Sequence, residues 1–272
     1  MSEWHFMDPS SRANLTEAWR REAEGMDKLA ADPERWEAPT GAGDWQVRDV
    51  VGHLIDTTET YFDSFDGARG RGQGPANLGL VDMARHVDAG GRSHRNLTQT
   101  QALERLRKAR DRMFGIAKEL DDKEWAGLIV PHKFMGPLPA AFYPLFQLVD
   151  YGLHSWDIRE GTGQGHILDG DSADLLVPLA FILWMSTPAV PPDTEPYTLG
   201  IKVTSGRNAG SHRVSVNPNG VQVQEGDVED LPAVIEFDPG TLILAAYGRL
   251  NGGTVRGDQA LAERFLNSFF RI

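Results

Sequence analysis

The chain contains no cysteine among its 272 residues. It can therefore form no disulfide, and it supplies no thiol of its own as a nucleophile, redox switch or metal ligand. Any sulfur chemistry must use a thiol that is brought in from outside. The absence of cysteine also fits a protein of a reducing compartment, so we expect a cytoplasmic location.

The sequence is also short of basic residues and of long apolar runs. Lys and Arg number 27 against 39 Asp and Glu, which gives a formal net charge of -12. Such a surface repels nucleic acid and anionic lipid, and the basic cluster 105–112 is interpreted as the solvated face of a helix. The most apolar segment, 175–185, is far shorter than the roughly 20 residues that span a bilayer. We therefore expect neither nucleic acid nor a membrane as a partner.

The first half of the chain has the periodicity of helices. Apolar residues at helical spacing predict long helices over 10–31, from Asp44 through residue 62, over 98–120 and over 144–161. Asp44 is the predicted N-cap of the second helix. The glycine-rich stretch 67–91 is long for a connector, and we expect it to line a site or to carry a short helix. Four such helices indicate a bundle.

The pattern changes at the proline-rich segment 188–196, which is interpreted as a linker. Strand periodicity follows over 199–203, and two further strands flank the turn Asn217-Pro218-Asn219-Gly220. Another strand is predicted over 233–237, with helices near 241–249 and 258–269. The sequence thus predicts two domains: an all-α four-helix bundle over 1–190 and a small α+β domain over 191–272.

A carboxylate and an imidazole lie one turn apart on the helix 144–161. Asp150 and His154 are at i, i+4, so that both can reach one cation. Asp157 could accept a hydrogen bond from the second ring nitrogen of His154 and so orient the imidazole. Spacing alone favours a solvated ion pair over a metal site, because such pairs are common on helices.

A third metal ligand must come from another helix, and His53 is the best candidate. It lies beside the apolar stripe of the second helix, where a neighbouring helix would approach. The other histidines are predicted in loops, at strand edges or in the glycine-rich stretch: His5, His86, His94, His132, His166 and His212.

Three stretches, in this order, resemble a known family. Residues 45–54, WQVRDVVGHL, resemble the entry to the second helix in the DinB-like bundle superfamily, closest to its mycothiol-dependent maleylpyruvate isomerases. Residues 150–157, DYGLHSWD, resemble the second signature of that branch. Residues 241–249, followed by Arg256-Gly257-Asp258, resemble the small sterol-carrier-like domain of the same proteins.

The resemblance implies a DinB-like four-helix bundle followed by a sterol-carrier-like domain. It further implies a divalent metal, zinc, bound by His53, Asp150 and His154, with an open fourth position for mycothiol or a similar thiol. Arg249 matches a catalytic arginine of the family, which can pair with a carboxylate. The alternative role for Arg249 is to bind the carbonyls at a helix end. The family usually has Glu or His at position 150, so the shorter Asp requires a closer helix.

The leading hypothesis is an enzyme that activates a low-molecular-weight thiol with its metal. Its reaction is either the cis–trans isomerisation of a small electrophilic substrate or S-transfer to it, and the sequence does not separate the two. One alternative is a non-catalytic small-molecule-binding protein whose metal is structural or absent. Another is a metal-dependent hydrolase that keeps water at the open metal position.

Overall fold

The computed structural model describes residues 3–165 and 167–270. They form two compact units, Met1–Leu168 and Asp169–Ile272. The helix α7 (Gly170–Ser186), which precedes the predicted boundary at 190/191, packs on elements of the second unit. The expected linker also pairs within this unit, because Pro188 forms a β-bridge with Phe269. A helical N-terminal region therefore precedes a domain that contains a sheet.

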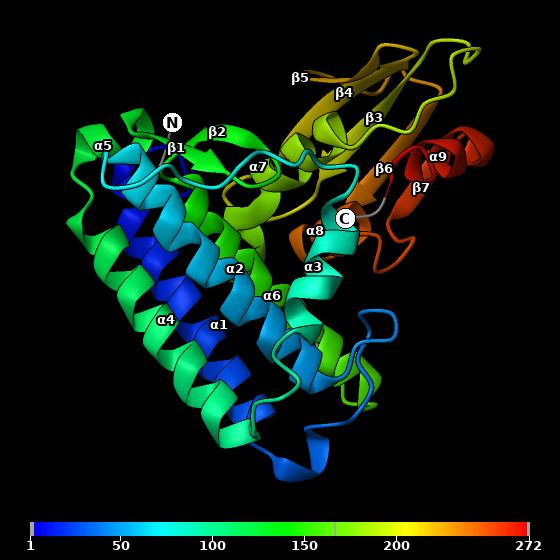
Figure 1. The fold of residues 1–272 in the computed structure, drawn as a ribbon. Coiled ribbons are helices and arrows are strands. Elements are labelled where there is room, and N and C mark those ends of the chain that lie inside the picture. Colours follow the sequence, from blue (N-terminus) through cyan, green and yellow to red (C-terminus); the bar gives the residue numbers. More distant parts are fainter. Residues whose placement is uncertain (1–2, 166, 271–272) are drawn as a thin grey trace. The chain divides into compact units, whose positions relative to one another are not determined.

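Long helices form the framework of the first unit (Figure 1). They are α1 (Arg12–Ala30), α2 (Val47–Ala68), α4 (Gln99–Glu119) and α6 (Phe142–Gly161). α1 packs chiefly on α6, and α2 packs on both α4 and α6. The apolar stripes face inward: Trp19, Leu54 and Met113 are almost completely buried. The four helices predicted from apolar spacing are therefore present.

α6 is buried on all sides. From Phe142 to Ile158, Asp150 alone is not fully in the interior. The polar face predicted for this helix therefore points into protein, and the solvated ion pair between Asp150 and His154 is not what the structure shows. Another polar contact on α6 is also internal, since the Thr58 hydroxyl of α2 donates to the Gln147 side chain.

The first unit also holds shorter elements. Two of them are strands, so the prediction that this region is all-α was wrong. The shorter elements are η1 (Pro9–Ser11), η2 (Pro33–Arg35), α3 (Met83–Arg92), α5 (Asp122–Gly127), β1 (Ile129–His132) and β2 (Gly136–Pro139). β1 and β2 form an antiparallel hairpin. Strands of four residues are too short to show a clear alternation in sequence, which explains why the hairpin was not predicted.

Asp44 does not cap α2, which corrects the prediction. The N-cap is Gln46, and Asp49 completes a capping box by accepting from the Gln46 backbone N–H. Asp44 instead accepts from Arg92 at 2.7 Å. Burial opposes ionisation of Asp49, but two hydrogen bonds from Arg95 and the cap bond outweigh it, so the pKa of Asp49 is lowered.

The basic cluster of α4 is not simply a solvated face. Arg105 makes two hydrogen bonds to Glu59 of α2, and Arg110 pairs with Asp27 of α1 at 2.8 Å. The guanidinium of Arg112 lies 3.9 Å from the ring centroid of Phe62. These arginines therefore join α4 to its neighbours.

α3 approaches α2 closely at glycine. A Cβ on Gly52 would lie 2.2 Å from the carbonyl oxygen of Gly91, so Gly52→Ala must push the two helices apart. We expect the free energy of unfolding, measured in urea, to fall by about 1–3 kcal/mol. Gly25→Ala in α1 is the matched control, since no atom lies within 4 Å of its Cβ. Helix propensity predicts that this control gains about 1 kcal/mol, and equal effects at both sites would contradict the prediction.

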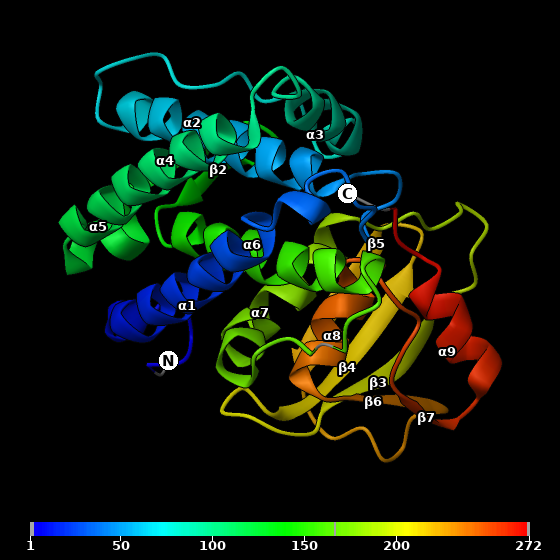
Figure 2. The ribbon, with the colours of Figure 1, turned by 90° about the horizontal axis from the view of Figure 1, so that it is seen from below.

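The second unit is built on a five-stranded sheet with the order β5-β4-β3-β6-β7 (Figure 2). Its strands are β3 (Tyr197–Val203), β4 (Gly210–Asn217), β5 (Gly220–Glu225), β6 (Ala233–Phe237) and β7 (Thr254–Gly257). β3 and β6 are parallel, and the other pairs are antiparallel. The predicted turn at 217–220 joins β4 to β5, with Gly220 at φ +126.

Helices complete the second unit. α7 packs on α8 (Pro239–Ala246), and α9 (Gln259–Leu266) packs on β6 and β7. The Trp184 ring of α7 lies in the core beside Phe237 and Phe265. Within the described part of the chain, no helix is both long and apolar enough to cross a membrane.

Candidate metal centre

The structure brings together the three residues predicted to bind a metal. His53 extends from α2, and Asp150 and His154 extend from α6. One potential ligand atom from each lies within 4.8 Å of those of the other two. His53 Nε2 is 3.7 Å from Asp150 Oδ1, and the two imidazole rings meet edge to face with centroids 4.9 Å apart. We refer to these residues as the His-Asp-His cluster.

Neighbouring side chains orient both imidazoles. His154 Nδ1 is 2.8 Å from Oδ2 of Asp157, which is fully buried. His53 Nδ1 is 3.3 Å from the hydroxyl oxygen of Thr57, one turn further along α2. Because both Nδ1 atoms have these partners, Nε2 is the nitrogen that each ring can offer to a cation. A carboxylate on the second nitrogen is a common arrangement at histidine metal ligands.

The cluster fits zinc in donor type and in spacing. Zinc binds nitrogen and carboxylate oxygen at about 2.0–2.2 Å, so two tetrahedral ligand atoms lie about 3.4 Å apart. The 3.7 Å between His53 Nε2 and Asp150 Oδ1 is close to this value. The shorter side chain of Asp150 therefore reaches the cluster without a Glu. Its side chain is 20% exposed against 8% for His53, so solvent reaches the cluster on the carboxylate side.

Trp45 packs beside the two histidines. Its ring centroid lies 5.3 Å from that of His53 and 5.8 Å from that of His154. The indole N–H donates to Asp88 of α3 at 2.8 Å, which fixes the ring. In the sequence Trp45 belongs to the motif 45–54, but its contact with both histidines depends on the loop that precedes α2.

His132, at the end of β1, is a buried histidine that the sequence did not single out. Its Nδ1 accepts the backbone N–H groups of Phe134 and Met135 at 3.2 and 3.0 Å. Burial lowers the pKa of His132 to about 4, and the charge of Asp150 opposes the shift only in part. His132 was predicted to lie in a loop or at a strand edge, and no local sequence pattern indicates its burial.

The remaining histidines lie outside the cluster. His86 is in α3 and His94 follows it, whereas His5 precedes η1. His212 lies on β4 in the second unit, where its ring contacts Phe181. His166 lies outside the described residues.

Arg249 lies in the second unit, in the turn after α8. Its guanidinium donates to the carbonyl of Tyr247 at 3.1 Å, and its backbone N–H donates to Leu244 at 2.8 Å. The first contact agrees with the helix-end role considered from the sequence.

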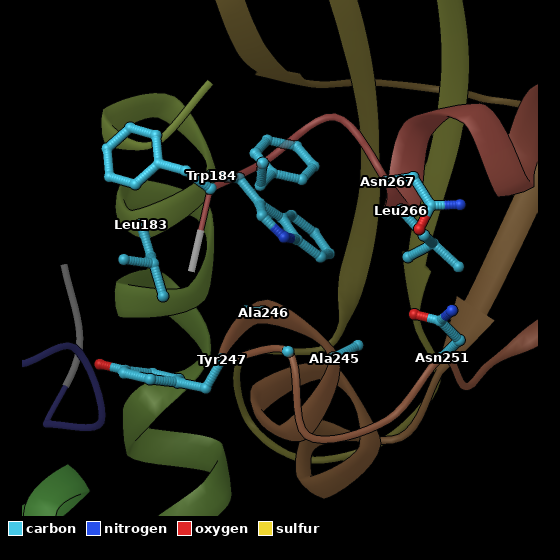
Figure 3. Close-up of a pocket in the computed structure, with 11 residues that line it drawn as sticks. Leu183, Trp184, Ala245, Ala246, Tyr247, Asn251, Leu266 and Asn267 are labelled. Atoms are coloured by element: carbon cyan, nitrogen blue, oxygen red, sulfur yellow. The ribbon is translucent and has the colours of Figure 1, made fainter. Parts of the chain in front are cut away.

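Gly248, directly before Arg249, and Asn251, two residues after it, line a pocket of the second unit. Figure 3 shows Trp184 and Tyr247 on one side of this pocket and Asn251 and Asn267 on the other. Arg249 is therefore next to a pocket of its own unit.

Asp157→Asn tests the support of His154. The substitution keeps the shape of the side chain and removes the negative charge that faces His154 Nδ1 at 2.8 Å. We expect the affinity for Zn²⁺, measured by competition with a chelating dye, to fall about 10- to 100-fold. Asp63→Asn on the exposed side of α2 is the control. An unchanged affinity in Asp157→Asn would show that the pair does not support metal binding.

The sequence of this chain matches a known protein family, and its fold is similar to that of a solved structure. The mycothiol maleylpyruvate isomerase N-terminal domain family matches residues 12–159, which include all three residues of the His-Asp-His cluster. None of the curated proteins matches the chain. The crystal structure of a mycothiol-dependent maleylpyruvate isomerase is similar in fold, with a TM-score of 0.60 and 12% sequence identity.

That similarity covers 90% of this chain and 92% of the other. A histidine-to-alanine mutant of the isomerase matches with the same TM-score and coverage. The fold thus extends the likeness beyond the matched N-terminal region, and the sequence match covers more than half of the chain. The chain belongs to the mycothiol maleylpyruvate isomerase N-terminal domain family.

Proposed function

We propose that this protein is a metal-dependent enzyme that activates a low-molecular-weight thiol of the mycothiol type. The activated thiol serves cis–trans isomerisation of a small electrophilic substrate, or S-transfer to it. The observation that carries the proposal is the His-Asp-His cluster, whose potential ligand atoms lie within 4.8 Å of one another on two helices. Family membership supports the thiol, and the absence of cysteine means that the sulfur must come from outside.

The residues of the chain have separate roles in this proposal. His53, Asp150 and His154 would hold the metal, and Asp157 would keep His154 turned with Nε2 toward it. A zinc ion there would lower the pKa of a thiol and so supply a thiolate at neutral pH. Trp45 covers one side of the two imidazoles and limits the access of water there. With three protein ligands, a bound zinc ion would keep a fourth position open for a thiol.

The second unit contributes to substrate binding in this proposal. Its sheet with flanking helices is compatible with the sterol-carrier-like domain that the sequence resembles. Arg249 lies beside the pocket shown in Figure 3, and a guanidinium can bind a carboxylate through two hydrogen bonds. We propose that it binds a carboxylate of the substrate or of the thiol.

The test combines metal analysis with a thiol-dependent assay. Protein purified without a histidine tag should contain one zinc per chain by mass spectrometry. It is then incubated with mycothiol and maleylpyruvate, and separately with mycothiol and 1-chloro-2,4-dinitrobenzene. Recovery of the trans isomer without net loss of thiol identifies an isomerase, and a stable thioether identifies an S-transferase.

The other hypotheses make different predictions in the same assay. A hydrolase would act on its substrate without added thiol. A non-catalytic binding protein would show no turnover, and its metal would be absent or would not respond to thiol. Substoichiometric metal that is unchanged in Asp150→Ala would overturn the proposed function.

A further inference from the structure

His132 has one ring nitrogen committed to the fold and the other without a partner. Nδ1 accepts two backbone N–H groups, from Phe134 and Met135, and so it carries no proton. The neutral ring must then carry its proton on Nε2. The lowered pKa of His132 keeps the ring neutral at physiological pH. His132 is therefore a fixed, uncharged hydrogen-bond donor.

Nε2 of His132 has no hydrogen-bond partner among the described residues. Several side-chain atoms without a partner are completely buried, but Nε2 of His132 is not one of these. It therefore borders open space. The rings around it belong to Tyr61, Phe134 and Phe146, with centroids 5.2–6.1 Å from that of His132. Each of these three residues keeps 4–8% of its surface exposed, whereas Tyr143, whose ring contacts those of Tyr61 and Phe146, is fully buried. We name Tyr61, His132, Phe134 and Phe146 the aromatic subsite.

The aromatic subsite adjoins the His-Asp-His cluster along two helices. Phe146 lies one turn before Asp150 on α6, an axial rise of about 6 Å. Tyr61 lies further along α2, the helix that carries His53. The charge of Asp150 acts on His132, which places the two side chains within electrostatic range of each other. Phe146 of the aromatic subsite is thus one helical turn from the carboxylate of the cluster.

We propose that His132 donates its Nε2–H to the carbonyl oxygen of a planar, conjugated substrate held in the aromatic subsite. The proposal rests on the proposed function and adds to it a hydrogen-bond donor for the carbonyl oxygen of the conjugated substrate. A planar π-system suits aromatic walls. A neutral donor fits a carbonyl oxygen, and this oxygen becomes negatively charged only during the reaction.

The donor acts on the charge that forms when sulfur adds. The thiolate sulfur bonds to the β-carbon, the electron pair of the C=C bond shifts toward the carbonyl, and the oxygen becomes an enolate. His132 keeps its proton and stabilises this oxygen by a hydrogen bond, as the donors of an oxyanion hole do. Rotation about the new single bond and loss of the thiolate give the isomer. Protonation of the α-carbon by water instead gives the thioether.

Two substitutions separate this role from a structural one. His132→Asn places an amide oxygen where Nδ1 accepts the two backbone N–H groups, but it removes the donor at Nε2. His132→Gln offers a donor near the position of Nε2 and loses the acceptor for the turn. A structural role makes His132→Gln the more harmful change, and the proposed role makes His132→Asn the more harmful one.

The first measurement is ligand binding, which does not depend on turnover. Acetophenone and ethylbenzene differ in the carbonyl oxygen, and their dissociation constants are measured by ligand-observed NMR with the metal-loaded protein. We expect the wild type to bind acetophenone about 2- to 10-fold more tightly than ethylbenzene, the value of one hydrogen bond. His132→Asn should lose this preference. Equal preference in the two proteins would overturn the proposal.

The second measurement is the rate of thiol addition to 4-phenylbut-3-en-2-one. We expect kcat of His132→Asn to fall about 100-fold with unchanged metal content, as for the loss of one oxyanion-hole donor. If the wild type is active and His132→Asn has the same kcat, the proposed role of His132 is overturned, but the proposed function is not. A wild type without metal or thiol-dependent turnover overturns the proposed function instead, and the binding measurement then still tests His132.

Discussion

Replacing His53 by alanine is expected to remove the metal and to abolish thiol-dependent turnover. The cluster has three protein ligands, and His53 is the single one from α2. Asp150 and His154 alone would hold zinc through two groups on one helix. The loss in affinity should therefore exceed the roughly 100-fold that changes in outer-shell partners can cost. Metal content after dialysis and the rate with mycothiol measure the two effects.

His5→Ala is the control for the loss of a histidine, because His5 lies before η1 and outside the cluster. It should keep one metal per chain and the rate of the wild type. The circular dichroism of His53→Ala should stay that of the wild type, since α2 is held by its apolar face. A His53→Ala protein that keeps stoichiometric metal and full activity would disprove the assignment of His53.

Sequence patterns predict the long helices of the first unit well, because each carries an apolar stripe over several turns. They also place Asp150 and His154 on one side of α6, since helical geometry is local. The position of His53 opposite them depends on how α2 packs on α6, and no periodicity reports this. The resemblance to a family supplied that pairing, and the distances agree with it.

Other features depend on contacts that are remote in sequence. α7 is almost entirely apolar after its first turn, so its sequence does not indicate which unit it joins. The acceptors for Arg105 and Arg110 come from α2 and α1, and the sequence of α4 alone suggested a solvated face. The role of His132 depends on a tight turn whose backbone N–H groups point at its ring. Composition and spacing do not encode such geometry.

His132 should also make the stability of the protein depend on pH. Its pKa is about 4 in the folded protein, against a reference value of 6.5. Between these values the unfolded chain binds a proton that the folded protein does not. The free energy of unfolding must therefore fall as the pH is lowered from about 6.5 toward 4, and it is unaffected by this group above about pH 7.

The expected contribution is a loss of about 2–3 kcal/mol between pH 7 and pH 4.5. Urea unfolding of the metal-free wild type and of His132→Asn at both pH values isolates it. The carboxylates and the remaining histidines titrate in both proteins, so their contributions cancel in the comparison. The asparagine side chain does not titrate. On acidification the free energy of unfolding of the variant should therefore fall by about 2–3 kcal/mol less than that of the wild type.

Parallel losses of stability in the two proteins would show that His132 is not held neutral by burial. Since the same buried, neutral ring is the proposed donor to the substrate, that result would also remove the physical basis for its role in the aromatic subsite.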